Sequence, residues 1–295
     1  PAGSALPEAG EEQGVYVLRI STSDQLIAMR RFVANWEPDV VHVHDAMLWE
    51  SLEYTHRCPT VYTAHVLHAA QNHWRGVSDD TLGLAAERRV MQHADRIVAP
   101  SQAAAELLLE AGYDVNDRLR VLRHGINDTP MAQEAVVADR SSGGVLCVGR
   151  FSDVKGSDDV EALIGYVGAR HPAVPLVVAG GVVDNPKVAR RWTKRFQECV
   201  TPGSNVSLPG WVERAELAKF YAQARVLVVP SHIETFGLVA LEGMLHGVAV
   251  LAYGCGALNE LIHTGQTGVC VPASDQTALM CALTELFFFY NAQSF

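Results

Sequence analysis

The residues in this sequence that are best suited to chemistry are two glutamates and two cations, which follow apolar runs. Glu234 and Glu242 lie in the segment PSHIETFGLVALEGMLHG, and Arg150 and Lys155 lie in GRFSDVKG. An arginine presents a planar fork to phosphate oxygens, and a lysine presents a point charge. An ionised carboxylate accepts hydrogen bonds from hydroxyls, such as the two hydroxyls of a ribose. The four residues could therefore bind a diphosphate and the hydroxyl-bearing groups attached to it.

A glycine precedes the second glutamate at the start of a predicted helix. The first N–H groups of a helix have no partners within it, and that end of its dipole is positive. Because Gly237 has no side chain, a phosphate can approach this backbone closely. Taken alone, this segment is equally compatible with an ordinary helix. A solvated surface pair such as Arg150 and Lys155 is common, so that segment alone is a weak signal.

Short apolar runs that alternate with amphipathic stretches must position these residues. Runs typical of buried strands cover residues 15–20, 39–43, 60–64, 96–99, 119–123, 144–148, 176–179, 206–208, 226–229, 248–252 and 269–271. This pattern predicts an α/β protein with two doubly wound parallel sheets, in which ligands bind beyond the carboxyl ends of the strands. We predict a mobile leader over residues 1–14, an N-terminal domain over 15–125, a linker over 126–143 and a C-terminal domain over 144–295.

The composition argues against several classes of protein. The chain has 295 residues, of which 48% are hydrophobic, so it can form substantial cores. It has 23 Lys+Arg against 33 Asp+Glu, and its net charge of −10 argues against nucleic acid as a partner. No apolar run approaches the ~20 residues that span a bilayer, so association with a membrane is not indicated.

The cysteines and histidines predict a cytoplasmic protein without a metal site. Six cysteines occur without a C-x-x-C pair, which favours a reducing compartment. Twelve histidines occur without an H-E-x-x-H motif or a set of cysteine ligands, so we expect polar residues at strand ends and on the surface. The sequence also lacks the motifs of P-loop kinases and of α/β-hydrolases.

Together the two charged segments resemble those of the retaining, nucleotide-sugar-dependent glycosyltransferases of family GT4, which have the GT-B fold. Glu234 and Glu242 stand in the E-x7-E arrangement of that family, and GRFSDVKG is similar to its G-R-x-x-x-x-K-G segment. PDVVHVHD, TVYTAH, ADRIVAPS and RVLRHGIN resemble landmarks of its N-terminal domain, in the expected order. The resemblance extends from about Val15 to the C-terminus and implies two Rossmann-like domains that face each other across a cleft.

The resemblance also implies roles for individual residues. Arg150 and Lys155 would bind the donor diphosphate and stabilise the departing nucleoside diphosphate. Glu234 would contact the donor sugar, and Glu242 would bind the ribose. Backbone N–H groups of Phe236, Gly237 and Leu238 would complete the donor site. The expected catalytic residues are His65, Glu234, Arg150 and Lys155, where His65 matches the histidine that lies near the transferred sugar.

The function implied by the resemblance is transfer of a sugar from a UDP- or GDP-type donor to a hydroxyl acceptor, with retention of configuration. A front-face mechanism, in which the leaving phosphate helps to deprotonate the acceptor, is expected, without a cofactor or metal ion. Two alternatives stay open: a non-catalytic nucleotide-sugar-binding subunit, and a GT-B-like sugar epimerase or phosphorylase. Compared with the family, we expect the N-terminal domain to lack its first strand and Gly-rich loop, and the closing helix stops at Phe295.

Overall fold

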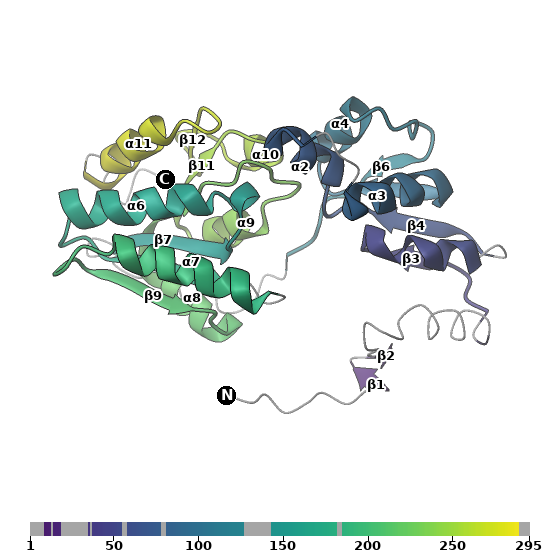
Figure 1. The fold of residues 1–295 in the computed structure, drawn as a ribbon, viewed down its shortest axis with the longest axis horizontal. Helices are drawn as coiled ribbons and strands as arrows, with labels where there is room; N and C mark the ends of the chain where they lie inside the picture. The colour runs from purple at the N-terminus through teal and green to yellow at the C-terminus, as the bar shows by residue number, and fades with distance from the viewer. Residues whose placement is uncertain are drawn as a thin grey trace. The chain divides into compact units, whose positions relative to one another are not determined.

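Strands alternate with helices along most of the chain in the computed structural model, as the sequence pattern predicts (Figure 1). The structure describes residues 9–12, 14–18, 35, 37–54, 58–77, 81–126, 143–181 and 185–288. Contacts divide the chain into two units, which comprise residues 1–99 with 108–120, and residues 100–107 with 121–295. Most of the predicted linker, residues 127–142, lies outside the described residues, so the predicted domain limits stay a prediction.

Six parallel strands form the sheet of the C-terminal unit, in the order β12-β11-β10-β7-β8-β9. They are β7 Gly144–Arg150, β8 Leu176–Gly181, β9 Val206–Gly210, β10 Ala224–Val229, β11 Ala249–Tyr253 and β12 Gly268–Val271. The chain builds outward from β7 to β9, and then from β10 to β12 on the other side of β7. The point where this direction reverses, between β7 and β10, is where open α/β sheets bind ligands.

Helices cover both faces of this sheet, because its strands are apolar on both sides. Val145 and Cys147 of β7 belong to a core that α6, α7 and α11 complete, whereas Leu146 belongs to a second core with α8, α9 and α10 (Figure 1). The bounds are α6 Ser157–Arg170, α7 Pro186–Cys199, α8 Arg214–Gln223, α9 Leu238–Leu245, α10 Leu258–Leu261 and α11 Gln276–Phe288. A single 3-10 turn, η2 Asp153–Lys155, separates β7 from α6.

A second sheet has the order β3-β4-β5-β6, and β4 pairs in parallel with both β3 and β5. Its strands are β3 Val41–Val43, β4 Thr60–Thr63, β5 Arg96–Ala99 and β6 Leu119–Val121. The helices described in this part of the chain are η1 Ala46–Tyr54, α2 His68–Arg75, α3 Leu82–His93 and α4 Gln102–Glu110. The two parallel sheets with alternating helices confirm the predicted α/β class.

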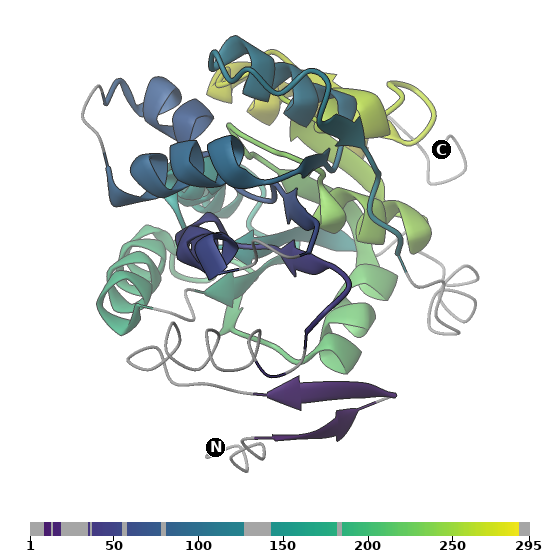
Figure 2. The ribbon, with the colours of Figure 1, turned by 90° about the vertical axis from the view of Figure 1, so that its right-hand side faces the viewer.

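The structure differs from the sequence prediction at the start of the chain. Strands β1 Ala9–Glu12 and β2 Val15–Leu18 form an antiparallel hairpin, which is purple in Figure 2. Residues 9–12, predicted as part of a mobile leader, thus pair with the predicted strand that follows them. Gly14 has a φ of 79°, and a two-residue hairpin turn requires such a left-handed conformation. Residues 1–8 and 13 of the predicted leader lie outside the described residues.

Candidate functional site

The predicted cations and glutamates follow two neighbouring strands at the switch point of the C-terminal sheet. Arg150 is the last residue of β7 and is exposed, and Lys155 ends η2. Glu234 lies in the loop after β10, which pairs in parallel with β7. The carboxyl ends of parallel neighbours meet at one edge of a sheet, so the strand order brings these segments together.

A close backbone approach fixes the turn after Lys155 against the loop that follows β10. Gly156 has a φ of 71°, and a Cβ atom on it would lie 1.9 Å from the carbonyl oxygen of Pro230. Only glycine fits both this conformation and this spacing. The approach brings the end of η2 against the main chain four residues before Glu234.

Lys155 and Glu234 form an ion pair, with Nζ 2.7 Å from Oε2. The lysine side chain is 36% exposed and the glutamate side chain is 13% exposed. The pair therefore retains access to solvent on the lysine side. A ligand anion could share the ammonium group, while the carboxylate could accept hydrogen bonds from hydroxyls next to that anion.

The loop that carries Glu234 is also held by the turn before α10. The N–H of Ala257 donates to the carbonyl oxygen of Glu234 at 3.0 Å. A Cβ atom on Gly256 would lie 2.2 Å from that same oxygen, so the two main chains touch. The Sγ of Cys255 donates to the carbonyl oxygen of Ser231 at 2.9 Å, and burial raises the pKa of this thiol to about 12. Cys255 is therefore a neutral packing residue and not a nucleophile.

The start of α9 presents backbone N–H groups beside this loop. Gly237 caps the helix with a φ of 90°. Phe236 is buried, and its ring meets that of His124 edge-on, with 4.9 Å between centroids. Leu238 is 47% exposed. The three predicted backbone contacts thus belong to one well-packed helix start with a solvent-facing side, which suits an anion.

Glu242 lies one turn into α9 and is anchored by a buried tyrosine. The hydroxyl of Tyr221 donates to Oε2 of Glu242 at 3.0 Å. Burial, and then the nearby Glu242 carboxylate, raise the pKa of Tyr221, so it stays a donor. The ring of His246 stacks on that of Tyr221, with 5.0 Å between centroids. The other oxygen of Glu242 can therefore bind a ligand while its orientation is fixed.

His65 lies just after β4 in the N-terminal unit, at the end of a chain of histidines. Its Nε2 atom is 2.8 Å from Nδ1 of His44. The ring centroids of His44 and His42 are 4.0 Å apart. The Nε2 of His42 is in turn 2.8 Å from Oγ1 of Thr63. Burial, and then the neighbouring His44, lower the pKa of His42. His65 thus has a preset ring orientation, as a polar group at a ligand site needs.

Other features of the described residues do not form competing sites. They contain no group of three or more histidine, cysteine or acidic side chains placed to hold a metal ion, and all six cysteines are free thiols. Among the described helices, none combines the length and the apolar character needed to cross a bilayer.

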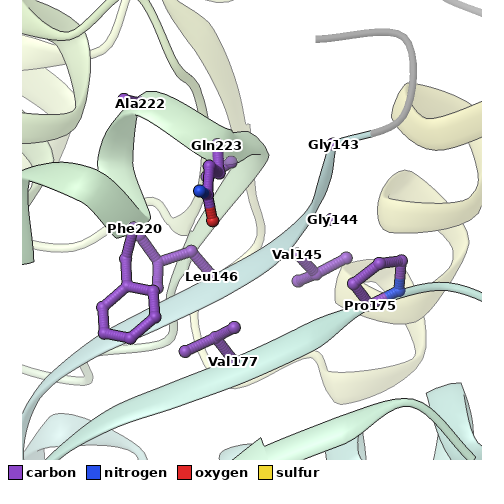
Figure 3. Close-up of a pocket in the computed structure, with 10 residues that line it drawn as sticks. Gly143, Gly144, Val145, Leu146, Pro175, Val177, Phe220, Ala222 and Gln223 are labelled. Carbon is purple, nitrogen blue, oxygen red and sulfur yellow. The ribbon is translucent and has the colours of Figure 1, made fainter. Parts of the chain in front are cut away.

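A cavity of about 350 Å³ lies at the amino end of β7, the end opposite to Arg150 (Figure 3). It is lined mainly by apolar side chains, including Val145, Val177 and Phe220. The lining residues that the structure describes carry no charged side chain, so this part of the cavity offers nothing to bind a phosphate.

Comparison with known proteins identifies the family. The family model described as "Glycosyl transferases group 1" matches residues 142–287, and the model "Glycosyltransferase Family 4" matches residues 17–129. The chain belongs to glycosyltransferase family 4. The two matches fall on the two halves of this GT4 chain, as the motifs predict.

Relatives and solved structures agree with the family. This GT4 chain is 27% identical over 256 residues to a glycogen synthase of Mycobacterium tuberculosis, covering 85% of the chain and 61% of the relative. It is 29% identical over 282 residues to a D-inositol 3-phosphate glycosyltransferase of Thermobispora bispora, covering 88% and 66%. The chain thus spans about half to two thirds of the length of the curated relatives that it matches.

Solved structures share the fold of this GT4 chain. The sucrose-phosphate synthase of Thermosynechococcus elongatus superposes with a TM-score of 0.77 at 24% identity, covering 96% of this chain and 76% of that one. The Anabaena protein HepE, in complex with UDP and glucose, gives a TM-score of 0.69 at 19% identity, covering 91% and 74%. These likenesses confirm the predicted GT-B fold.

The structure of this GT4 chain brings Lys155 and Glu234 into direct contact. Phe236, Gly237, Leu238 and Glu242 lie on the segment that continues from Glu234, and Arg150 ends the neighbouring strand. His65 belongs to the N-terminal unit, where it contacts His44. Sequence reasoning missed the anchoring role of Tyr221, because a tyrosine at such a position carries no distinctive spacing.

Proposed function

We propose that this protein is a retaining glycosyltransferase that moves a sugar from a UDP- or GDP-type donor to a hydroxyl acceptor. The observation that carries the proposal is the Lys155–Glu234 pair, 2.7 Å apart, at the switch point where a helix start also lies. A cation, a carboxylate and the N–H groups of a helix start in one place suit a phosphate joined to a sugar.

Different residues of the chain bind the different parts of the donor. Arg150 and Lys155 bind the diphosphate and stabilise the negative charge that grows on it as the bond to the sugar breaks. Glu234 accepts hydrogen bonds from the sugar hydroxyls, and Glu242 accepts them from the ribose. The N–H groups of Phe236, Gly237 and Leu238 bind phosphate or sugar oxygens at the start of α9.

In the proposed reaction, the acceptor hydroxyl attacks the anomeric carbon from the face that the nucleoside diphosphate leaves. The acceptor proton passes to an oxygen of the leaving phosphate, so no protein nucleophile is needed. His65 provides a polar group near the transferred sugar. Two cations and a helix start supply the positive charge at the diphosphate, so we propose that no metal ion is required. A cytoplasmic location stays a prediction.

Calorimetric titration with UDP, GDP and ADP, followed by turnover of the matching nucleotide-glucose, tests this function. The Anabaena protein HepE forms complexes with UDP and with UDP-glucose, which makes UDP the first probe. We expect one nucleotide to bind, equally well with EDTA present. Proton NMR of the newly formed sugar product should show the anomer of the donor. The inverted anomer would contradict retention, and binding without turnover over a panel of acceptors would favour a non-catalytic subunit.

Replacing Tyr221 with phenylalanine should weaken nucleotide binding about 5- to 10-fold. The change removes the hydrogen bond that orients Glu242, and a bond to a charged group contributes about 1.5–3 kcal/mol where it is buried. Calorimetry measures the dissociation constant. Tyr166→Phe is the matched control, because the hydroxyl of Tyr166 pairs with Thr284 on the other face of the sheet, at 2.8 Å. Equal affinity in Tyr221→Phe and wild type would mean that Glu242 does not bind the nucleotide.

A further inference from the structure

The two segments that carry Lys155 and Glu234 are joined by a second pair of polar side chains. The Nε2 atom of His232 lies 2.9 Å from Oδ2 of Asp159, and the side chains are 10% and 8% exposed. Asp159 follows Lys155 on one segment, and His232 precedes Glu234 on the other. The segments are therefore linked twice, by an outer pair that solvent reaches and by an inner pair that is nearly buried.

The inner pair is fully engaged by its surroundings. Oδ1 of Asp159 accepts hydrogen bonds from the Tyr253 hydroxyl at 2.7 Å and from Nε2 of Gln276 at 3.2 Å. The Nδ1 of His232 lies 2.9 Å from Oγ of Ser274, so both ring nitrogens have partners. The rings of His232 and Tyr253 stack, with 5.4 Å between centroids. The inner pair is thus held by residues of β11 and of the chain around the start of α11, as well as by its own segments.

Backbone contacts tie His232 to the segment of Lys155 as well. The N–H of His232 donates to the carbonyl oxygen of Val154 at 2.9 Å, next to Lys155 in the chain. Ser274, which contacts the His232 ring, has a φ of 61°, in the left-handed region that non-glycine residues seldom occupy. Such conformations persist where the surrounding structure holds them, and they are concentrated around ligand sites.

The inner pair orients groups more than it stabilises the fold. Removing a carboxylate and its polar partner from water offsets most of the gain from pairing them, so a buried contact of this kind contributes little net stability. Burial raises the pKa of Asp159, but hydrogen bonds from His232 and Tyr253 and the electrostatic interaction with His232 outweigh that effect, so the net pKa lies below its usual value. Asp159 therefore stays ionised at neutral pH and holds the imidazole in one orientation.

We propose that His232 and Asp159 are positioning residues, which hold the Glu234 loop against η2 so that Lys155 and Glu234 keep their spacing when a nucleoside diphosphate binds. This inference rests on the proposed function. A bound diphosphate competes with Glu234 for the Lys155 ammonium, which weakens the outer pair. The inner pair is shielded from solvent and keeps its partners, so the two segments stay aligned around the ligand.

The test compares His232→Ala, His232→Gln and Asp159→Asn with wild type, by calorimetric titration with UDP, GDP and ADP and by thermal melting. We expect His232→Ala to bind the preferred nucleotide about 10-fold more weakly. His232→Gln keeps an N–H donor and should recover part of this loss. If His232→Ala does not fold, the glutamine and asparagine variants carry the comparison, and wild-type affinity in both would overturn the proposal.

Tyr253→Phe is the matched control, because it removes one hydrogen bond to Asp159 but keeps the ring that stacks on His232. It should lower the melting temperature while leaving nucleotide affinity within about twofold of wild type. Equal losses of affinity in Tyr253→Phe and His232→Ala, at equal melting temperatures, would mean a purely structural role and overturn the proposal. If wild type binds none of the nucleotides, the proposed function itself fails, and the inference fails with it.

Discussion

Replacing Lys155 with alanine will lower sugar transfer roughly 100- to 1,000-fold, the range seen when one preorganised group that stabilises a developing charge is removed. The ammonium group lies 2.7 Å from Glu234 at the switch point of the sheet. In the proposed reaction, the diphosphate would then lose a cation and would also face the unpaired carboxylate of Glu234, which is 13% exposed. Both effects oppose the build-up of charge on the leaving group. Release of nucleoside diphosphate from the donor measures the rate.

Lys187→Ala is the matched control for charge, because Lys187 is an exposed lysine in the first turn of α7. It changes the net charge of the protein by the same amount and should leave transfer within about twofold of wild type. Lys155→Arg keeps the charge and should retain more activity than Lys155→Ala. Unchanged transfer in Lys155→Ala would mean that this segment does not bind the diphosphate.

Replacing Gly156 with alanine will destabilise the C-terminal unit by about 2–5 kcal/mol. A left-handed conformation costs an alanine about 1–2 kcal/mol, and the added Cβ would lie 1.9 Å from the Pro230 carbonyl oxygen. Relieving that clash requires the backbone to move, at a further cost of about 1–3 kcal/mol. We expect a fall in melting temperature of roughly 5–10 °C, measured by circular dichroism. The movement separates Lys155 from Glu234, so nucleotide binding should weaken as well.

Gly203→Ala separates the two causes of this loss. Gly203 has a φ of 82°, but a Cβ atom on it would have no neighbour within 4 Å. It should therefore show only the conformational cost, about 1–2 kcal/mol, and no change in nucleotide affinity. If both alanine variants lose equal stability, the contact between Gly156 and Pro230 is not what holds the two segments together.

The outline of the C-terminal domain could be predicted from the sequence because it depends on local patterns. A run such as VLVV is apolar at every position, and only a strand buried on both faces suits it. The general rule for parallel sheets then places the residues after each strand at one edge, which singled out Arg150, Lys155 and Glu234. The start of the chain was less predictable, since pairing of residues 9–12 in a hairpin depends on Gly14 and not on an apolar pattern.

The sequence by itself therefore determined the α/β class, the family and the segments that carry the candidate site. Tertiary structure alone decided which side chains meet: Lys155 with Glu234, Tyr221 with Glu242, and Asp159 with His232. The physical reason is that these pairs join positions far apart in the chain. Lys155 and Glu234, for example, are 79 positions apart. Their meeting depends on strand order and on backbone approaches of the kind made by Gly156, which no local periodicity records.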